Sequence, residues 1–360
     1  MDNIIGYLKE FGGYTFSERS FNEVDALILA QFSYFGWGNV IPGLSKNTEA
    51  VSLEQMKEKM DASEVFYFKM YEIDNKKLWA ELLASRRFAH MKCNYISDIF
   101  SETMQTQFCA FTVFPEGSLP VVIYRGTDDT ILGWKEDYDM AKDAPIAGQR
   151  IASMYLRQVA LRIEGDFMVV GHSKGGNLAV FSVLDNNEDV QKRVAGIYNY
   201  DGPHFRKDIL DNYEYEKIKD KIHKYIPQSS VVGILMETEH DYKVVYSAAN
   251  VGSKQHNPYN WAVKRGKFVY EDDVHGHSKR LNEMLQSVIG NMDNDQIELI
   301  GRLIFAILEA GDISSTEELW GDERKSISQL LASMKNMQPE LKEQIKELVG
   351  ELIKESFSKD

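Results

Sequence analysis

One short segment of the chain has residue types and spacing that could perform covalent catalysis: Gly171-His172-Ser173-Lys174-Gly175-Gly176. It fits G-x-S-x-G, the pattern in which a serine lies on a tight turn between a strand and a helix. Glycine suits such a turn because backbone atoms approach too closely for a Cβ on either side of the serine. A buried-strand run at 166–170 precedes the motif and a helical pattern at 177–181 follows it. We therefore predict that Ser173 is a nucleophile, the alternative being a glycine-rich turn without catalysis.

A serine on such a turn needs a base and an acid that orients the base, and in this architecture the acid precedes the histidine along the chain. Asp201 ends the next expected strand, 194–200, and the carboxyl ends of neighbouring parallel strands share one rim of a sheet. We predict that Asp201 is the acid. The alternative is turn formation, because Asp201-Gly202-Pro203 is also a good turn sequence.

His256 is the predicted base among the eight histidines. It follows the expected strand 243–248, at the carboxyl end of that strand, where chain order places the base. His172 lies inside the motif and is expected to point away from the nucleophile's face. His204, close after Asp201, is a further candidate but comes early in that order. His275 and His277 are the alternative candidates for the base. Two spaced histidines also occur in metal sites, but without further ligands they do not define one. We predict no metal and no cofactor.

Two backbone amides are candidates to bind the oxyanion that forms when a serine attacks a carbonyl. Lys174 follows the nucleophile at the start of the expected helix, where the helix dipole is positive. Thr127 follows the expected strand 119–124, a place from which such folds supply the second donor. We predict that the amides of Thr127 and Lys174 form the oxyanion hole.

The elements around these residues alternate between apolar strands and amphipathic helices. Expected strands lie at 107–114, 119–124, 167–170, 194–200, 222–226 and 243–248, and expected helices at 151–163 and 177–184. This order predicts an α/β fold with a mostly parallel central sheet covered by helices on both faces. Together with the serine motif, it predicts an α/β-hydrolase fold.

The chain of 360 residues is longer than one small core needs, so we expect further parts around this sheet. Residues 1–90 are expected to form helices packed on the core, one opening at the capping box Ser20–Glu23 and a second at Ser52–Gln55. The core spans 91–290. Residues 291–360 hold 15 acidic and eight basic residues, net −7, and their three amphipathic patterns predict an acidic helical appendage.

Composition narrows the class of protein. Lys and Arg total 41 against 55 Asp and Glu, net −14, which argues against nucleic acid and anionic lipid surfaces as partners. The sequence has no run of 18 apolar residues, so we expect no stable membrane insertion, and its first residues lack the pattern of a secretory signal. Cys93 and Cys109 are too few for a disulfide framework. We predict a cytoplasmic protein.

Four short segments carry a resemblance to known proteins. They are GHSKGGNLA at 171–179, YDGP at 200–203, PQS at 227–229 and QHNP at 255–258, the last followed by Trp261. Together they resemble a bacterial family of lipase-like α/β-hydrolases, a domain family of unknown function. Arg125-Gly126-Thr127 with Trp134 is similar to the related class-three lipases. The resemblance covers residues 15–310 and implies a serine hydrolase fold with ester cleavage as its activity.

The sequence departs from the class-three lipases in one respect. Those lipases carry their acid in an Asp-x-x-Pro segment after the following strand. The matching stretch here is Lys224-Tyr225-Ile226-Pro227, with lysine in place of the aspartate. Either Asp201 has taken over the role, or one of Glu237, Glu239 and Asp241 has, or the triad is incomplete.

The sequence therefore predicts a serine hydrolase that cleaves carboxylic esters, lipid-like or short in their acyl part, through a Ser-His-Asp triad and an acyl-enzyme. The expected partner is a small-molecule acyl ester, and the C-terminal helices could bind a protein or a second copy of the chain. The alternative is a degenerate hydrolase scaffold that acts as a binding or regulatory protein, since a fold does not fix a function. The aromatic residues within 32–37 would suit either a lid or an ordinary core.

Overall fold

The computed structural model describes residues 2–44, 49–66, 71–101, 103, 106–127, 145–205, 207–212, 215–235, 241–249, 252–276, 278–280, 283–284, 339, 343, 345–347 and 350. The predicted appendage at 291–360 therefore lies almost entirely outside the described residues. The same holds for four other residues that the sequence singled out, namely Trp134, Glu237, Glu239 and His277.

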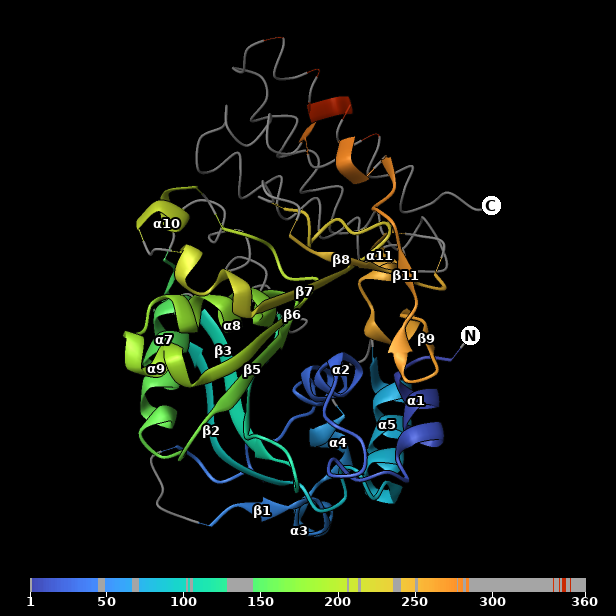
Figure 1. Cartoon of the computed structure of the whole chain (residues 1–360), viewed down its shortest axis with the longest axis vertical. Helices are drawn as coiled ribbons and strands as arrows, with labels where there is room; N and C mark the ends of the chain where they lie inside the picture. The colour runs from blue at the N-terminus through green and yellow to red at the C-terminus, as the bar shows by residue number, and fades with distance from the viewer. Residues whose placement is uncertain are drawn as a thin grey trace.

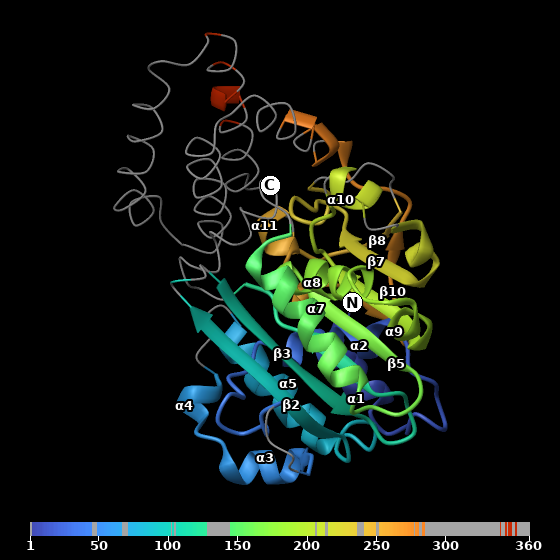
Figure 2. The same ribbon diagram turned by 90° about the vertical axis from the view of Figure 1, so that its left-hand side faces the viewer.

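A mixed sheet of nine strands organises the described part of the chain (Figures 1 and 2). In spatial order its strands are β1 (Val51–Ser52), β2 (Lys92–Ser101), β3 (Thr106–Phe114), β4 (Val121–Tyr124), β5 (Phe167–His172), β6 (Val194–Tyr200), β7 (Ile222–Pro227), β8 (Lys243–Val245) and β11 (Tyr270–Glu271). Strands β4 to β8 run parallel, and those on either side pair antiparallel. The α/β fold is as expected, but the sheet is parallel only in its centre. The connections between β2, β3 and β4 are short, and short connections can join only antiparallel neighbours.

Two layers of helices cover this sheet: α1 (Ile4–Phe11), α2 (Glu23–Phe32) and α5 (Glu72–Ala84) on one face, and α7 (Ala147–Ala160) and α8 (Lys174–Leu184) on the other (Figure 1). Alternate residues of a central strand pack into different layers. Val121 and Ile123 pack with the N-terminal helices, whereas Val122 and Tyr124 pack with α7 and α8. Both faces are buried, which explains why these strands read as continuous apolar runs.

The remaining described elements are short. They are α3 (Leu53–Lys59), α4 (Ala62–Val65), α9 (Glu188–Arg193), α10 (Lys207–Asn212), α11 (Gly252–Gln255), the 3-10 turns η2 (Tyr215–Lys217), η3 (Lys219–Lys221) and η4 (Pro258–Asn260), and a hairpin of β9 (Val263–Lys264) with β10 (Lys267–Phe268). Within the described ranges, no helix is long and apolar enough to cross a bilayer.

The helix α2 begins two residues later than the sequence pattern indicated. The predicted capping box Ser20–Glu23 is wrong, because Asn22 caps the helix. Its Oδ1 accepts hydrogen bonds from the backbone amides of Val24 and Asp25 at 2.8 and 3.2 Å. Asp25 completes the box by accepting from the amide of Asn22 at 2.9 Å. Asparagine is as good an N-cap as serine, and the carbonyl of Ser20 instead accepts from Arg87. The second predicted box, Ser52–Gln55, is confirmed at the start of α3.

The strand β2 is an element that the sequence pattern did not indicate. Its pairing with β3 shifts register between Asn94 and Ser97, and Tyr95, inside this irregularity, has a φ of 61°. A bulge of this kind interrupts the alternation by which a strand is recognised. The expected strands 107–114 and 119–124 are both present, as β3 and β4, and the short connection between them joins an antiparallel pair.

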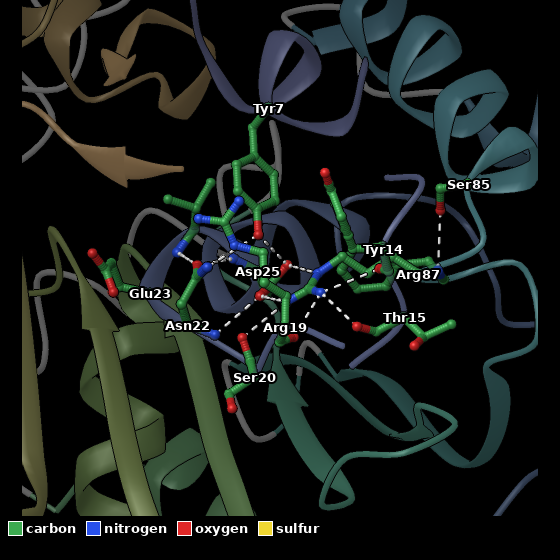
Figure 3. A network of polar contacts seen from close by, with 12 residues as sticks. Tyr7, Tyr14, Thr15, Arg19, Ser20, Asn22, Glu23, Asp25, Ser85 and Arg87 are labelled. Carbon is green, nitrogen blue, oxygen red and sulfur yellow. Dashed lines mark hydrogen bonds and ion pairs between the residues drawn. The ribbon is translucent and has the colours of Figure 1, made fainter. Parts of the chain in front are cut away.

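A buried ion pair between Arg87 and Asp25 holds the N-terminal layer together (Figure 3). Nη2 of Arg87 lies 2.5 Å from Oδ2 of Asp25, Nε lies 2.7 Å from Oδ1, and both side chains are fully buried. The guanidinium also donates to the carbonyls of Arg19 and Ser20 at 2.9 and 3.1 Å, and the Tyr7 hydroxyl donates to Asp25 at 3.0 Å. Because both charges are paired and hydrogen-bonded, they fix the loop before α2 and the start of that helix.

Candidate active site

Ser173 lies between β5 and α8 with backbone angles that few residues other than glycine adopt. Its φ is 57° and its ψ is −134°. The turn is tight, since a Cβ on Gly171 would lie 2.0 Å from the carbonyl oxygen of Gly175, and a Cβ on Gly175 would lie 2.2 Å from that of Tyr124. Backbone strain persists only where the surrounding structure fixes it, and it is concentrated at functional sites. Strand, strained serine and helix thus follow one another in the order that the motif indicated.

The structure brings Asp201 and His256 together. Asp201 follows β6 and is 1% exposed, and its Oδ2 lies 2.6 Å from Nδ1 of His256. Its Oδ1 accepts from the hydroxyl of Ser230 at 2.5 Å and from the amide of Gly233 at 3.1 Å. Because a carboxylate only accepts hydrogen bonds, the imidazole proton belongs on Nδ1, and Nε2 keeps its lone pair. This is the tautomer that a general base requires.

Ser173 and His256 are both neighbours of His172. The rings of His172 and His256 lie 4.5 Å apart between centroids, and Nε2 of His172 lies 2.9 Å from the carbonyl oxygen of His256. The His256 side chain is 23% exposed and Ser173 is 9% exposed. Among the described residues no hydrogen bond joins Ser173 Oγ to Nε2 of His256. Catalytic hydrogen bonds are often long or poorly aligned before a substrate binds.

The side chain of His172 is buried against the predicted base. The expectation that it points away from the catalytic face is therefore wrong, because the loop that carries His256 folds over the end of β5 and meets the His172 ring. Burial, and next the nearby His256, hold the pKa of His172 well below its usual range, so its ring is neutral.

His275 and Asp241, the alternative base and the alternative acid within the described residues, have other partners. Nδ1 of His275 lies 2.9 Å from the hydroxyl of Ser229. The exposed Asp241 forms an ion pair with Lys219 at 2.9 Å. Of the candidates inside the described ranges, Asp201 is thus the acid that contacts a histidine in this site.

The two segments that carry the predicted oxyanion donors meet at the nucleophile. A Cβ on Gly126, which precedes Thr127, would lie 3.1 Å from Cβ of Ser173. Lys174 is the first residue of α8, so its amide is one of the four that lack an intrahelical partner. The Lys174 side chain is occupied elsewhere, because its Nζ donates to the carbonyl of Gln107 at 2.8 Å.

A cavity of about 420 Å³ borders these segments. Its lining residues are Gly36, Gly38, Asn39, Glu64, Asp98, Phe100, Gln107 and Arg125. Arg125 directly precedes Gly126, so one wall of the cavity adjoins the segment that meets Ser173, whereas Ser173, Asp201 and His256 are not among its lining residues. Arg125 pairs with Asp98 at 3.3 Å. The lining combines apolar surface with the charged side chains of Glu64, Asp98 and Arg125.

Sequence reasoning missed the residues that hold Asp201, the candidate acid, and the role of Tyr34 beside His172, which contacts the candidate base. Ser230 and Gly233 come after β7, and the only signal for them is a polar turn following a strand adjacent to β6. Tyr34 was indicated only as an aromatic residue for a core or lid, yet its hydroxyl lies 2.8 Å from Nδ1 of His172. These contacts join residues that are far apart in the sequence, so no local sequence pattern predicts them.

The fold and this constellation describe an α/β protein with a strained serine at the carboxyl end of its central parallel strands. The chain belongs to the Mbeg1-like family, whose model matches residues 82–306. This match confirms the resemblance to a lipase-like family. No curated protein matches the chain.

Three solved lipase structures are similar to the chain at low identity. The M37 lipase is 14% identical, with 59% of this chain and 69% of that chain covered and a TM-score of 0.36. Lipase II from Rhizopus niveus is 13% identical, with 62% and 89% covered and a TM-score of 0.36. The lipase of Rhizomucor miehei, in its propeptide complex, is 13% identical, with 56% and 71% covered and a TM-score of 0.32. At these values the three lipases inform no detail of the site.

Proposed function

We propose that this protein is a serine hydrolase that cleaves carboxylic esters through an acyl-enzyme on Ser173. The observation that carries the proposal is the pairing of His256 Nδ1 with Asp201 Oδ2 at 2.6 Å, beside a serine in a strained turn. A buried carboxylate on one ring nitrogen leaves the other free to act as a base. Membership of a lipase-like family supports the same reaction class.

The reaction begins when Oγ of Ser173 attacks the ester carbonyl and its proton passes to Nε2 of His256. The carbonyl oxygen becomes an oxyanion, which the amides of Thr127 and Lys174 stabilise. The intermediate collapses as His256 returns the proton to the departing alcohol, and an acyl ester remains on Ser173. Water then attacks this ester with the same proton transfers and releases the carboxylic acid.

Asp201 serves this sequence by holding the imidazole. Its two oxygens have separate tasks, since Oδ1 is fixed by Ser230 and Gly233 while Oδ2 accepts from His256. A carboxylate fixed in this way keeps the imidazole in one tautomer and stabilises the imidazolium that forms during attack.

The charged groups in the cavity that adjoins Gly126 favour short or polar acyl groups over long alkyl chains. The cavity holds the Arg125–Asp98 ion pair together with Glu64 and Asn39, and long alkyl chains gain little from such walls. The net charge of −14 also disfavours work at an anionic lipid surface. The proposed substrate class is therefore a small acyl ester.

The test is intact-mass labelling with a fluorophosphonate probe, which reacts with activated serines. We expect one adduct on the wild type, none on Ser173→Ala, and one on the control Ser118→Ala, which removes a hydroxyl in the turn between β3 and β4. A folded wild type without an adduct would overturn the proposal in favour of a binding protein on a hydrolase scaffold. An adduct that persists in Ser173→Ala would place the reactive serine elsewhere.

A further inference from the structure

Building on the proposed hydrolase, we propose that Tyr34 and His172 are positioning residues for its base: the Tyr34 hydroxyl fixes one tautomer of His172, and His172 in turn holds the main chain of His256. Tyr34 lies just after α2, in the N-terminal helical layer and outside the residues that the family model matches. The inference thus assigns a role in the site to a part of the chain that the motifs leave out.

The three residues form an unbroken chain of hydrogen bonds. The hydroxyl of Tyr34 lies 2.8 Å from Nδ1 of His172, and Nε2 of His172 lies 2.9 Å from the carbonyl oxygen of His256. Tyr34 is 2% exposed and His172 is fully buried. Water therefore does not compete for these bonds.

The direction of each bond follows from its acceptor. A carbonyl oxygen only accepts, so Nε2 of His172 carries a proton and donates it to His256. The buried His172 ring is neutral, so its Nδ1 has no proton and must accept. Tyr34 is then the donor to Nδ1. If the Tyr34 hydroxyl is removed, the tautomer with the proton on Nδ1 becomes accessible, and that tautomer cannot donate to His256.

His256 is consequently held at two points. Asp201 fixes Nδ1 of the ring, and His172 fixes the main-chain carbonyl from which that ring projects. The two imidazole rings also pack together, with 4.5 Å between centroids and 34° between planes. One contact alone leaves the ring free to pivot, whereas two fix the direction of Nε2, and a displacement of about 1 Å can cost a hundredfold in rate.

Tyr34 also borders the oxyanion segment. A Cβ on Gly126 would lie 2.1 Å from the Tyr34 hydroxyl and 3.1 Å from Cβ of Ser173. The hydroxyl therefore occupies the space beside Gly126, between the segment that carries Thr127 and the His172 ring. Tyr34 contacts the surroundings of the nucleophile and, through His172, those of the base.

The experiment compares Tyr34→Phe, His172→Phe and the double variant, with a soluble chromogenic acetate ester and with the fluorophosphonate probe. We expect each single variant to lower kcat and the labelling rate by about 10- to 100-fold with KM little changed. The double variant should be no slower than His172→Phe, because Tyr34 acts through His172. His172→Gln, which keeps one donor and one acceptor, should recover part of the rate, and the control Tyr14→Phe should match the wild type.

Imidazole ¹⁵N spectra give a readout that a general loss of stability does not move. In the wild type His172 should show a protonated Nε2, and Tyr34→Phe should shift the ring toward protonated Nδ1. A wild type that labels at Ser173 while Tyr34→Phe labels at the same rate would overturn this inference and leave the hydrolase intact. Additive losses in the double variant would also overturn it. A folded wild type that never labels overturns the proposed hydrolase itself.

Discussion

Oδ2 of Asp201 lies 2.6 Å from Nδ1 of His256 although Asp201 directly follows β6, one strand earlier than the acid of the class-three lipases to which the sequence bears a resemblance. At the position of that acid β7 carries Lys224, which is buried. β6 and β7 are parallel neighbours, with Tyr200 opposite Tyr225, so their carboxyl ends reach the same rim. An acid can therefore reach the same histidine from either strand, and the sequence departure does not leave His256 without a carboxylate.

Asp201→Asn should lower kcat for a chromogenic acetate ester by about 10⁴-fold, because the neutral amide favours the wrong tautomer of the base. The control Asp241→Asn removes an exposed carboxylate that pairs with Lys219 and should change kcat less than about twofold. Steady-state kinetics at one pH compare kcat of the two variants with that of the wild type, and thermal melts confirm that both variants fold. A loss below tenfold in Asp201→Asn would mean that another acid orients His256.

Gly126→Ala should both destabilise the protein and abolish probe labelling of Ser173. The added methyl group would lie 2.1 Å from the Tyr34 hydroxyl and 2.7 Å from the carbonyl oxygen of His172, and neither side can move freely because both are buried. Overpacking of this kind costs about 1–3 kcal/mol of unfolding free energy. Gly13→Ala is the matched control, since its Cβ would meet nothing within 4 Å. Equal melting temperatures for the two variants would contradict the close approach of the Tyr34 hydroxyl to Gly126.

The parts of this protein that sequence could predict are those governed by local patterns. Apolar runs and glycines indicate the strand before Ser173 and the helix after it. Chain order then places an aspartate and a histidine at strand ends, and the structure brings Asp201 and His256 into contact there. The α/β alternation is a local signal too, so the general fold class followed from it.

The parts that sequence could not predict depend on contacts between distant segments. Ser230 is one such residue, because its bond to Asp201 requires the turn after β7 to fold back over β6. Tyr34 and His172 are 138 residues apart, and nothing near Tyr34 marks its hydroxyl as part of the site. The prediction of where α2 begins failed for a different reason. Ser20 and Asn22 are equally good N-cap residues, and the hydrogen bond from Arg87 to the Ser20 carbonyl favours the start at Asn22.

Acyl-chain length should discriminate between a small-ester hydrolase and a long-chain lipase. Because Arg125 and Asp98 form a charged pair in the cavity wall, we expect kcat/KM for acetate and butyrate esters to exceed that for dodecanoate by at least about tenfold. The measurement uses one leaving group throughout, below the micelle concentration of the long esters. A rate that rises steadily with chain length would contradict the proposed substrate class.

Arg87→Leu should destabilise the protein far more than the loss of an exposed arginine. The substitution leaves the Asp25 carboxylate buried without its counter-ion, which costs about 3–5 kcal/mol of unfolding free energy. Its neighbour Arg86, 3.7 Å from Glu18 at the surface, provides the control, and Arg86→Leu should cost no more than about 1 kcal/mol. Urea titrations followed by fluorescence measure both. Similar midpoints for the two variants would show that the buried pair does not hold the N-terminal layer.

The stability of the wild type should fall as the pH falls below about 6.5, and His172 should cause much of that slope. The unfolded chain takes up a proton on this histidine near its ordinary pKa, whereas burial and the adjacent His256 ring keep the pKa in the folded protein well below that value. The contribution is therefore complete above pH 6.5 and is lost progressively toward the folded pKa, by up to about 1.4 kcal/mol per pH unit for one proton.

Urea titrations at pH 7.5, 6.5 and 5.5 test this expectation by comparing the wild type with His172→Gln, which cannot titrate and should show a shallower slope. Burial and Lys243 also lower the pKa of the half-buried His223, so that histidine contributes in the same direction and His223→Gln gives the size of its share. If His172→Gln keeps the full wild-type slope, the His172 ring is not held neutral in the folded protein, and the donor–acceptor assignment from Tyr34 through His172 to His256 fails with it.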